Sequence, residues 1–338
     1  SGRQRFEYRY RILVCVTILQ ALMNPIASLV LIRINGGTAM MRILGIVGVQ
    51  VCICVPIIVF QFCKGKEFFS KEYWGYALRI GIPIVPHYLS GIILNQGDRI
   101  MIDKMVGKTE VALYGLAYSI GMLVQLFISG MNSALTPWMY SKIKKGDIRS
   151  MRKVLQLLSI VVVGIAVALM LISPEMVLIF GSPKYREAVY VIPPVAASVF
   201  FIFIYNILSM PQFYYEKTQF LMAASMAAAG ANVVLNFIFI RLFGYIAAGY
   251  TTLACYMLYS VGHYIVSKQI LVNEGIQENL MNPGFLLACS VFLIGASIIC
   301  NLIFPYRILR YAILLASAGL VFWKKELLLK TMADIRKK

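Results

Sequence analysis

The sequence predicts an all-α protein that crosses a membrane about ten times, and three observations lead to this fold class. Hydrophobic residues make up 60% of the 338 residues and charged residues 14%, whereas soluble domains contain about half and about a quarter, respectively. The mean hydropathy is +0.78. Apolar runs that are long enough to cross a ~30 Å hydrocarbon layer follow one another along almost the whole chain.

The apolar runs define the expected helices in order, and short charged or turn-forming connections separate them. The runs are 12–32, 43–63, 76–95, 111–140, 154–180, 188–210, 218–240, 244–266, 285–304 and 308–323. The last run is short, so it could be tilted or only interfacial. An even number of crossings predicts that both chain ends lie on the same side of the membrane.

The basic residues predict which side that is. Of the 32 Lys and Arg residues, 22 fall in the terminal segments and in the alternate connections that share their side, and 10 fall in the other connections. The positive-inside rule therefore predicts that both ends of the chain lie in the cytoplasm. The net charge of +18 is then explained by orientation and by attraction to membrane lipids, and it needs no nucleic acid.

The connections are too short to fold as separate domains, so any function must lie within the helices. This argues against an enzyme, and we expect no catalytic residues and no metal site. Asp98 and Asp103 are followed directly by Arg99 and Lys104, which indicates charge pairing more than metal binding. The seven cysteines show no ligand-type spacing beyond a lone Cys-x-Cys pair and are interpreted as small apolar residues.

The run that begins at 76 is unusual because polar and ionisable residues share about half of its helical circumference. Such residues are costly in lipid and mark functional sites by default. An alternative for the two arginines is that they reach to the membrane surface from the helix ends. The double proline at 83 and 86 is expected to bend the helix and to leave carbonyls that a histidine could satisfy, as an alternative to proton coupling. The members of this first stripe are Arg79, His87, Asn95 and Asp98, and Arg99 follows directly after Asp98.

Two further stripes of uncharged polar residues follow at helical spacing. The second contains Tyr118, Met122, Gln125, Ser129, Asn132 and Thr136, and the third contains Thr252, Tyr256, Tyr259 and His263. Such residues either join helices through hydrogen bonds or line a cavity, and the spacing alone does not decide between these readings.

An ordered series of segments resembles the polysaccharide flippases of the MOP superfamily. The segments are GIPIVPHYLSGIILNQGDRIMI at 81–102, KMVGKTEVALYGLAYSIG at 104–121, SPEMVLIFGSPKYREAVYVIPPVA at 173–196, MPQFYYEKTQF at 210–220, ANVVLNFIFI at 231–240 and FGYIAAGYTTLACYMLY at 243–259. The series covers nearly the whole chain, which makes it more specific than any single segment.

The resemblance implies fourteen helices, in two lobes of six around a central cavity with two more at the C-terminus. Residues 1–63 would be the last two helices of the N-lobe, and the first four helices would be missing from this chain. Residues 64–75 would connect the lobes in the cytoplasm, and 76–271 would form the C-lobe. Residues 284–323 would be the two additional helices, followed by a basic cytoplasmic tail at 324–338.

The resemblance also implies a function, which is to move undecaprenyl-diphosphate-linked oligosaccharide repeat units to the outer leaflet by alternating access. These units serve O-antigen, capsule or exopolysaccharide assembly, and polysaccharide polymerase machinery would be a partner. Arg79 and Arg99 are expected to contact the diphosphate or acidic sugars, and His87 and Asp98 to tune charge or couple a cation, Na⁺ or H⁺. The expected sugar contacts and remaining cavity residues are Asn95, Tyr118, Gln125, Asn132, Tyr256 and His263.

Three alternatives remain open from the sequence. A MATE-like multidrug or cation antiporter shares the architecture but should prefer acidic cavity residues. A lipid II flippase would carry most of its basic cavity residues on the missing helices. A membrane polysaccharide polymerase or ligase would need a large external loop, and a non-transporting scaffold would leave the charged run unexplained.

Overall fold

The computed structural model describes residues 10–36, 39–65 and 69–323. These residues form helices and contain no strand, which confirms the all-α polytopic prediction. Eight helical segments in them are long and apolar enough to cross a membrane. The expected runs at 244–266 and 308–323 do form helices but are not among the eight. The second has only 17 residues, and the first has a hydropathy lowered by its Thr, Ser and Tyr side chains. The predicted basic tail, 324–338, lies outside the described residues.

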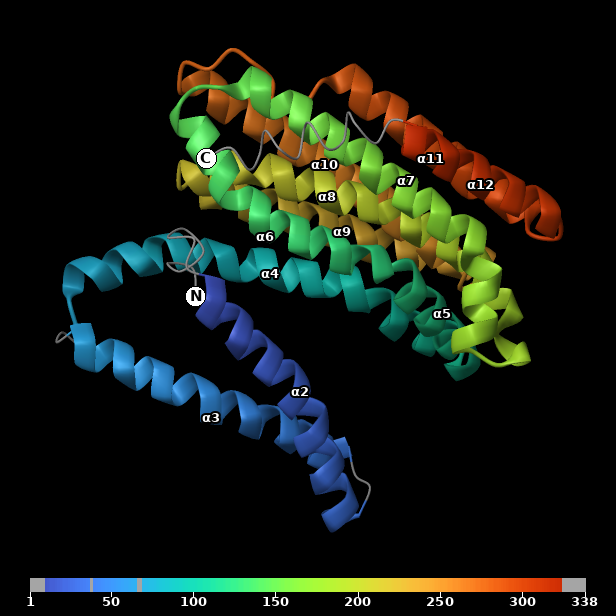
Figure 1. Ribbon diagram of the computed structural model, residues 1–338, viewed down its shortest axis with the longest axis horizontal. Helices are drawn as coiled ribbons and strands as arrows, with labels where there is room; N and C mark the ends of the chain where they lie inside the picture. Colours follow the sequence, from blue (N-terminus) through green and yellow to red (C-terminus); the bar gives the residue numbers. More distant parts are fainter. Residues whose placement is uncertain (1–9, 37–38, 66–68, 324–338) are drawn as a thin grey trace. The chain divides into compact units, whose positions relative to one another are not determined.

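The helices group into two compact units, 1–79 and 80–338. In the first unit, α2 (Tyr10–Asn35) and α3 (Ala39–Gly65) form a helical hairpin (Figure 1). The two helices approach closely at Gly45, where an added Cβ would lie 2.6 Å from Cα of Ser28. The Ser28 hydroxyl donates to the backbone oxygens of Asn24 at 2.7 Å and of Arg42 at 3.2 Å. A small residue opposite a hydroxyl is a common way to join membrane helices.

Helix α4 (Lys71–Met105) is a single helix of 35 residues, and the division between the units falls within it. The sequence analysis expected residues 64–75 to connect the two lobes, whereas α4 already begins at Lys71. The helix also continues through Pro83 and Pro86, and the bend expected at the two prolines stays a prediction. The Ser90 hydroxyl donates to the Pro86 backbone oxygen at 2.8 Å, which adds a donor in this stretch.

The predicted helix 111–140 is interrupted, and this corrects the sequence analysis. Helix α5 (Lys108–Gly121) and α6 (Leu123–Lys144) meet at Met122, which leaves the helical conformation. Gly121 packs against α8 so closely that a Cβ there would lie 2.6 Å from Cγ1 of Val195. The second polar stripe was interpreted as one helix face, but Tyr118 lies on α5 and Gln125 on α6.

Helix α8 (Ile192–Tyr214) is the centre of the second unit (Figure 1). It follows α7 (Ile148–Phe180) and the 3₁₀ helix η1 (Pro183–Val191), and it contacts α5, α6, α7, α9, α10 and α11. Nineteen of its 23 residues are buried, so it is packed on all sides, as expected for a helix that is apolar around its whole circumference.

Four further helices complete this unit. They are α9 (Thr218–Phe243), α10 (Ala247–Asn273), α11 (Pro283–Ile303) and α12 (Arg307–Trp323). Arg310 on α12 is 3% exposed, and its guanidinium donates to both carboxylate oxygens of Glu175 on α7, at 2.7 and 2.8 Å. It also donates to the Leu171 backbone oxygen at 2.6 Å. The charge count from the sequence included Arg310 among the basic residues of a connection, whereas the structure buries it against α7.

Candidate functional site

A cavity of about 720 Å³ lies within the second unit, between α4, α5, α6, α8 and α10. We call it the polar cavity. Planar amides, hydroxyls and phenol rings dominate its polar lining, and one guanidinium joins them. The polar lining residues are His87, Asn95, Gln96, Arg99, Tyr118, Ser119, Gln125, Tyr205, Asn206, Ser209, Tyr256 and Tyr259, with Tyr88 at its edge.

Helix α4 supplies one wall of this cavity, and it is held there mainly by long polar side chains. Among the described residues, no other helix packs its backbone closely along α4. The buried residues of α4 form one narrow line at intervals of four, which are Ser90, Leu94, Asp98 and Ile102. Hydrogen bonds from tyrosine, threonine and serine side chains bridge the space to the neighbouring helices.

Asp98 is the deepest polar residue of this wall and is fully buried. The Tyr114 hydroxyl of α5 and the Thr252 hydroxyl of α10 both donate to its Oδ2, the second at 3.1 Å. Its Oδ1 has no hydrogen-bond partner among the described residues. An orphaned carboxylate oxygen in an apolar interior is costly, so the site is suited to take up a proton or a cation.

Asn95 lies one turn closer to the cavity and joins the same three helices. Its Oδ1 accepts hydrogen bonds from the Tyr118 hydroxyl at 2.7 Å and from the Tyr256 hydroxyl at 3.1 Å. Its Nδ2 donates to the Gly91 backbone oxygen at 2.7 Å. Asn95 therefore fixes the two phenol rings that form the cavity floor.

His87 makes the third polar contact of α4. Its Nδ1 shares hydrogen bonds with the Ser225 hydroxyl of α9, at 2.5 Å, and with the Tyr259 hydroxyl of α10, at 3.1 Å. The sequence left open whether this histidine satisfies carbonyls freed by the prolines or couples a proton, and a proton-coupling role stays a prediction. The structure shows it bonded across to α9 and α10 while it also lines the cavity.

Arg99 is the cationic side chain of the cavity lining. Its guanidinium carbon lies 4.8 Å from the centre of the Tyr118 ring, and it donates a hydrogen bond to Gln96. Stacking on a phenol face holds a guanidinium in place while its N–H groups remain available at the edge. This arrangement can bind an anionic or strongly polar group.

His263 lies behind the cavity and is fully buried. Its Nδ1 is bonded to Nε2 of Gln212 on α8 at 2.8 Å. Its ring contacts those of Tyr205 and Tyr259, with centroid distances of 5.8 and 4.5 Å. It therefore supports the aromatic wall from behind.

The candidate residues from the sequence separate into three groups. Six line the cavity, which are His87, Asn95, Arg99, Tyr118, Gln125 and Tyr256. Asp98 and His263 are buried behind its wall. Arg79 is exposed and belongs to the first unit, and Asn132 is half-buried on α6 without lining the cavity. Their roles in binding remain predictions.

Sequence reasoning did not include several lining residues of α8 among the candidates. Tyr205, Asn206 and Ser209 lie within a largely apolar helix, and the Tyr205 and Tyr256 rings stack at 10° and 6.3 Å. Three polar residues within one apolar run would have been the signal. The run lacks the ionisable groups that drew attention to α4.

A second polar cluster joins α9 to α10 and lies outside the cavity lining. Thr251 donates to Asn236, and Asn236 Nδ2 donates to Asn232 Oδ1 at 3.1 Å. This supports the interpretation of polar residues as links between helices for this pair. Within the described part of the chain, no three His, Cys, Asp or Glu residues gather as a metal-binding group.

Comparisons with known proteins match the chain to two families. A family described as "Polysaccharide biosynthesis protein" matches residues 4–144, and the family MatE matches residues 83–238. The overlap of the two matches contains most of the cavity-facing part of α4. No solved structure is significantly similar to the chain.

Two relatives come from Haemophilus influenzae. A protein named for the Lsg locus is 28% identical over 172 residues, which cover 48% of this chain and 41% of the relative. A membrane protein of that organism is 29% identical over 191 residues, which cover 53% of this chain and 46% of the relative. The chain thus spans about half the length of the curated relatives it matches.

Proposed function

From the premise that this chain belongs to the MOP superfamily of membrane transporters, we propose that it is part of a polysaccharide flippase. Its substrate would be an undecaprenyl-diphosphate-linked oligosaccharide repeat unit, moved from the inner to the outer leaflet for cell-surface polysaccharide assembly. O-antigen or capsule are the products we expect. The match to the polysaccharide biosynthesis family supports this substrate class over others in the superfamily.

The observation that carries the proposal is the composition of the polar cavity. A sugar chain offers hydroxyls that can both donate and accept, and planar amides and phenols meet both needs. Gln125, Asn206 and Tyr256 supply such groups. Arg99 supplies the positive charge that a diphosphate or an acidic sugar requires. The prenyl tail would stay in the bilayer, because only the polar part needs a water-filled path.

Asp98 is the residue we assign to coupling. Asp98 lies between Asn95 and Arg99 in the sequence of α4, and uptake of a proton or Na⁺ at its Oδ1 would change its bonds to Tyr114 and Thr252. Those two residues belong to α5 and α10, so the change would alter how α4 is held. In this proposal, the bonds of Asp98 to Tyr114 and Thr252 link the binding of a cation to the position of α4.

The antiporter alternative fits the cavity less well. A cavity for organic cations would present acidic side chains to the ligand, whereas the charged side chain of this lining is Arg99 and Asp98 is fully buried behind it. A lipid II flippase would use the same kind of contacts and differs in the sugar rather than in the site. A polymerase or ligase finds no support in the lining, which lacks a pair of carboxylates.

The protein would lie in the cytoplasmic membrane of a bacterium with both described ends of the chain in the cytoplasm. The basic residues near the α6–α7 connection support this orientation, since Lys142, Lys144, Lys145 and Arg149 lie at one end of the second unit. Polysaccharide polymerase machinery remains the expected partner.

Deletion and complementation test the proposal. We would remove the complete gene from its chromosome and measure surface polysaccharide together with lipid-linked repeat units on the cytoplasmic leaflet. The expected result is loss of surface polymer, accumulation of unflipped units, and recovery of both on re-expression. Re-expression of Arg99→Ala should not restore transport, whereas Arg241→Ala, which removes an exposed arginine of α9 outside the cavity, should. Normal surface polymer with altered sensitivity to cationic drugs would overturn the proposal in favour of an antiporter.

A further inference from the structure

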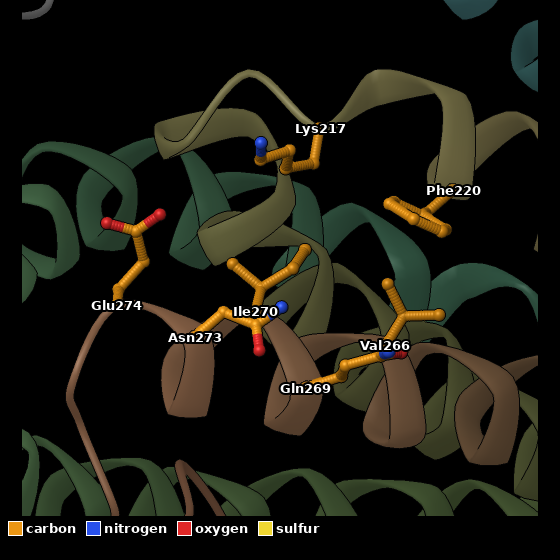
Figure 2. Close-up of a pocket in the computed structure, with 7 residues that line it drawn as sticks. All are labelled: Lys217, Phe220, Val266, Gln269, Ile270, Asn273 and Glu274. Carbon is orange, nitrogen blue, oxygen red and sulfur yellow. The ribbon is translucent and has the colours of Figure 1, made fainter.

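A second pocket of about 270 Å³ lies where α9 begins and α10 ends (Figure 2). Lys217, just before α9, and Phe220, in its first turn, line one side of the pocket. Gln269 and Asn273 near the end of α10 and Glu274 directly after it line the other. None of these residues lines the polar cavity. We call this second site the headgroup pocket, for the reason developed below.

The headgroup pocket lies at the basic end of the second unit. The segment after α10 is tied to the start of α7 by Arg149, which donates to Glu278 at 3.2 Å, and by Arg152, which donates to the Asn279 backbone oxygen at 2.7 Å. The pocket is therefore at the same end as the basic α6–α7 connection. Helix α9 begins a candidate membrane span at Thr218, directly after Lys217, so we infer that the pocket lies near the level of the lipid headgroups.

The pocket carries one charge of each sign. The Lys217 ammonium and the Glu274 carboxylate extend from opposite sides toward the same open space above Ile270 and Asn273 (Figure 2). They form no ion pair with each other or with another residue in the described ranges. The lining of the pocket thus contains a cation, an anion and two side-chain amides.

The side of the pocket that faces the bilayer is apolar. Phe220 is 48% exposed on α9, and Val266 lines the pocket on α10. Below them the two helices approach closely through small residues, since a Cβ at Gly262 would lie 3.8 Å from that of Ala224. A ligand with a polar head and hydrocarbon chains would place its head against the charged part of the pocket and its chains against the apolar part.

The geometry points to a binding site for a zwitterionic aminophospholipid, with phosphatidylethanolamine as the type. Its phosphate would bind Lys217 and the amides of Gln269 and Asn273, and its primary ammonium would donate to Glu274. Its acyl chains would run past Phe220. This assignment does not depend on the transported substrate.

The Glu274 carboxylate distinguishes the headgroup pocket chemically from the basic surface around it. The basic end attracts any anionic lipid, because each exposed Lys or Arg near the membrane surface adds a favourable interaction. Glu274 opposes an anionic headgroup and favours one that brings its own ammonium. A quaternary ammonium lacks the N–H donors that a primary ammonium offers to a carboxylate.

Native mass spectrometry of the purified, delipidated protein tests the assignment. Phosphatidylethanolamine, phosphatidylcholine and phosphatidylglycerol with matched acyl chains would be titrated separately. The expected result is tighter binding of the first, by about tenfold, the ratio that one charge-assisted hydrogen bond supplies. Glu274→Gln should remove the preference, and Lys217→Ala should weaken the binding of all three lipids. Lys268→Ala, next to the pocket but not in its lining, is the matched control and should change neither.

The lipid preference of the wild-type protein is measured without any substitution. The assignment can therefore be overturned even if a variant fails to fold. Equal binding of the three lipids, or tighter binding of phosphatidylglycerol, would overturn it. An unchanged preference in a folded Glu274→Gln protein would overturn it as well. Because surface polysaccharide is not the readout, failure here leaves the proposed transport function standing.

Discussion

Helices α8 and α4 are both membrane-length helices of the same chain, but they are held in opposite ways. Nineteen of the 23 residues of α8 are buried, against four of the 35 residues of α4. Helix α8 is fixed by close apolar packing on six neighbouring helices. Helix α4 is fixed by hydrogen bonds that Asp98 and Asn95 accept and that His87 shares across a polar space.

The difference indicates that α8 and α4 have different roles within the second unit. Close packing depends on many contacts at once, so it resists any change in helix position. A few hydrogen bonds can exchange partners one at a time, with water or a substrate hydroxyl taking over. We therefore interpret α8 as the fixed support of the polar cavity and α4 as its adjustable wall.

The largest expected effect on stability lies in α8. Phe203 is fully buried there, and Phe203→Ala should lower the free energy of unfolding by about 3 kcal/mol, because it opens a cavity that the neighbours fill only in part. Thermal unfolding in detergent would measure this. Phe292→Ala on α11, where the ring is 56% exposed, is the control and should cost far less. Equal losses of stability in the two variants would show that the buried ring of α8 contributes no more to stability than the exposed ring of α11.

The next effect concerns the buried pair that ties α12 to α7. Arg310→Ala would remove two hydrogen bonds to the Glu175 carboxylate and the donor of the Leu171 backbone oxygen. We expect a loss of about 2 kcal/mol, since a largely buried acceptor that loses its donor is costly. Protease sensitivity of the α11–α12 segment would report its release. Arg307→Ala removes an exposed arginine 3.8 Å from the same carboxylate and should have little effect. No change in Arg310→Ala would show that α12 is held by its apolar contacts.

A smaller effect on folding is expected in α4. Tyr118→Phe removes one hydrogen bond to Asn95 while Tyr256 still donates to the same oxygen, so unfolding should change by about 1 kcal/mol or less. Transport should fall more than stability does, since the hydroxyl lies in the cavity lining. Comparison of surface polysaccharide with the amount of folded protein in the same cells separates the two. A parallel decline of both would argue against α4 as an adjustable wall.

The smallest effect belongs to the exposed basic end. The Asp147 carboxylate caps α7 by accepting from the Ser150 backbone N–H at 3.3 Å, and it pairs with Lys142 at 2.6 Å. The hydrogen bond from Lys142 lowers the pKa of Asp147. A lowered folded-state pKa means that the stabilisation is present above the unfolded value of about 4 and is lost as the pH falls through the folded value.

Asp147→Asn should therefore be slightly less stable than the wild type at neutral pH and equal to it in acid. Melting temperatures measured from pH 7 down to pH 3 would show whether the two curves converge. Asp103→Asn, at an exposed position of α4, controls for a general effect of charge. Curves that run parallel throughout would contradict the assigned role of the carboxylate.

The sequence was sufficient for the class of fold and for the polar face of α4, because ionisable residues in an apolar run have few explanations. His87, Asn95 and Arg99 do line one cavity. The break at Met122 was not predicted, since it depends on the approach of Gly121 to Val195 of a helix some seventy residues away. The burial of Arg310 was missed for the same reason, because its partner Glu175 is distant in sequence. Tyr205 was missed because its importance comes from the rings stacked on it, which no local pattern reveals.

The most direct test of the account is the effect of Asp98→Asn on transport and on folding together. The amide keeps the shape and can still accept from Tyr114 and Thr252 through its oxygen, so the protein should fold and melt close to the wild type. It cannot bind a coupling proton or Na⁺ as a carboxylate does, so surface polysaccharide should fall more than about tenfold, and lipid-linked repeat units should accumulate on the cytoplasmic leaflet. Full surface polysaccharide in cells whose only copy is Asp98→Asn would contradict the central claim, which is that Asp98 on α4 couples a cation to transport.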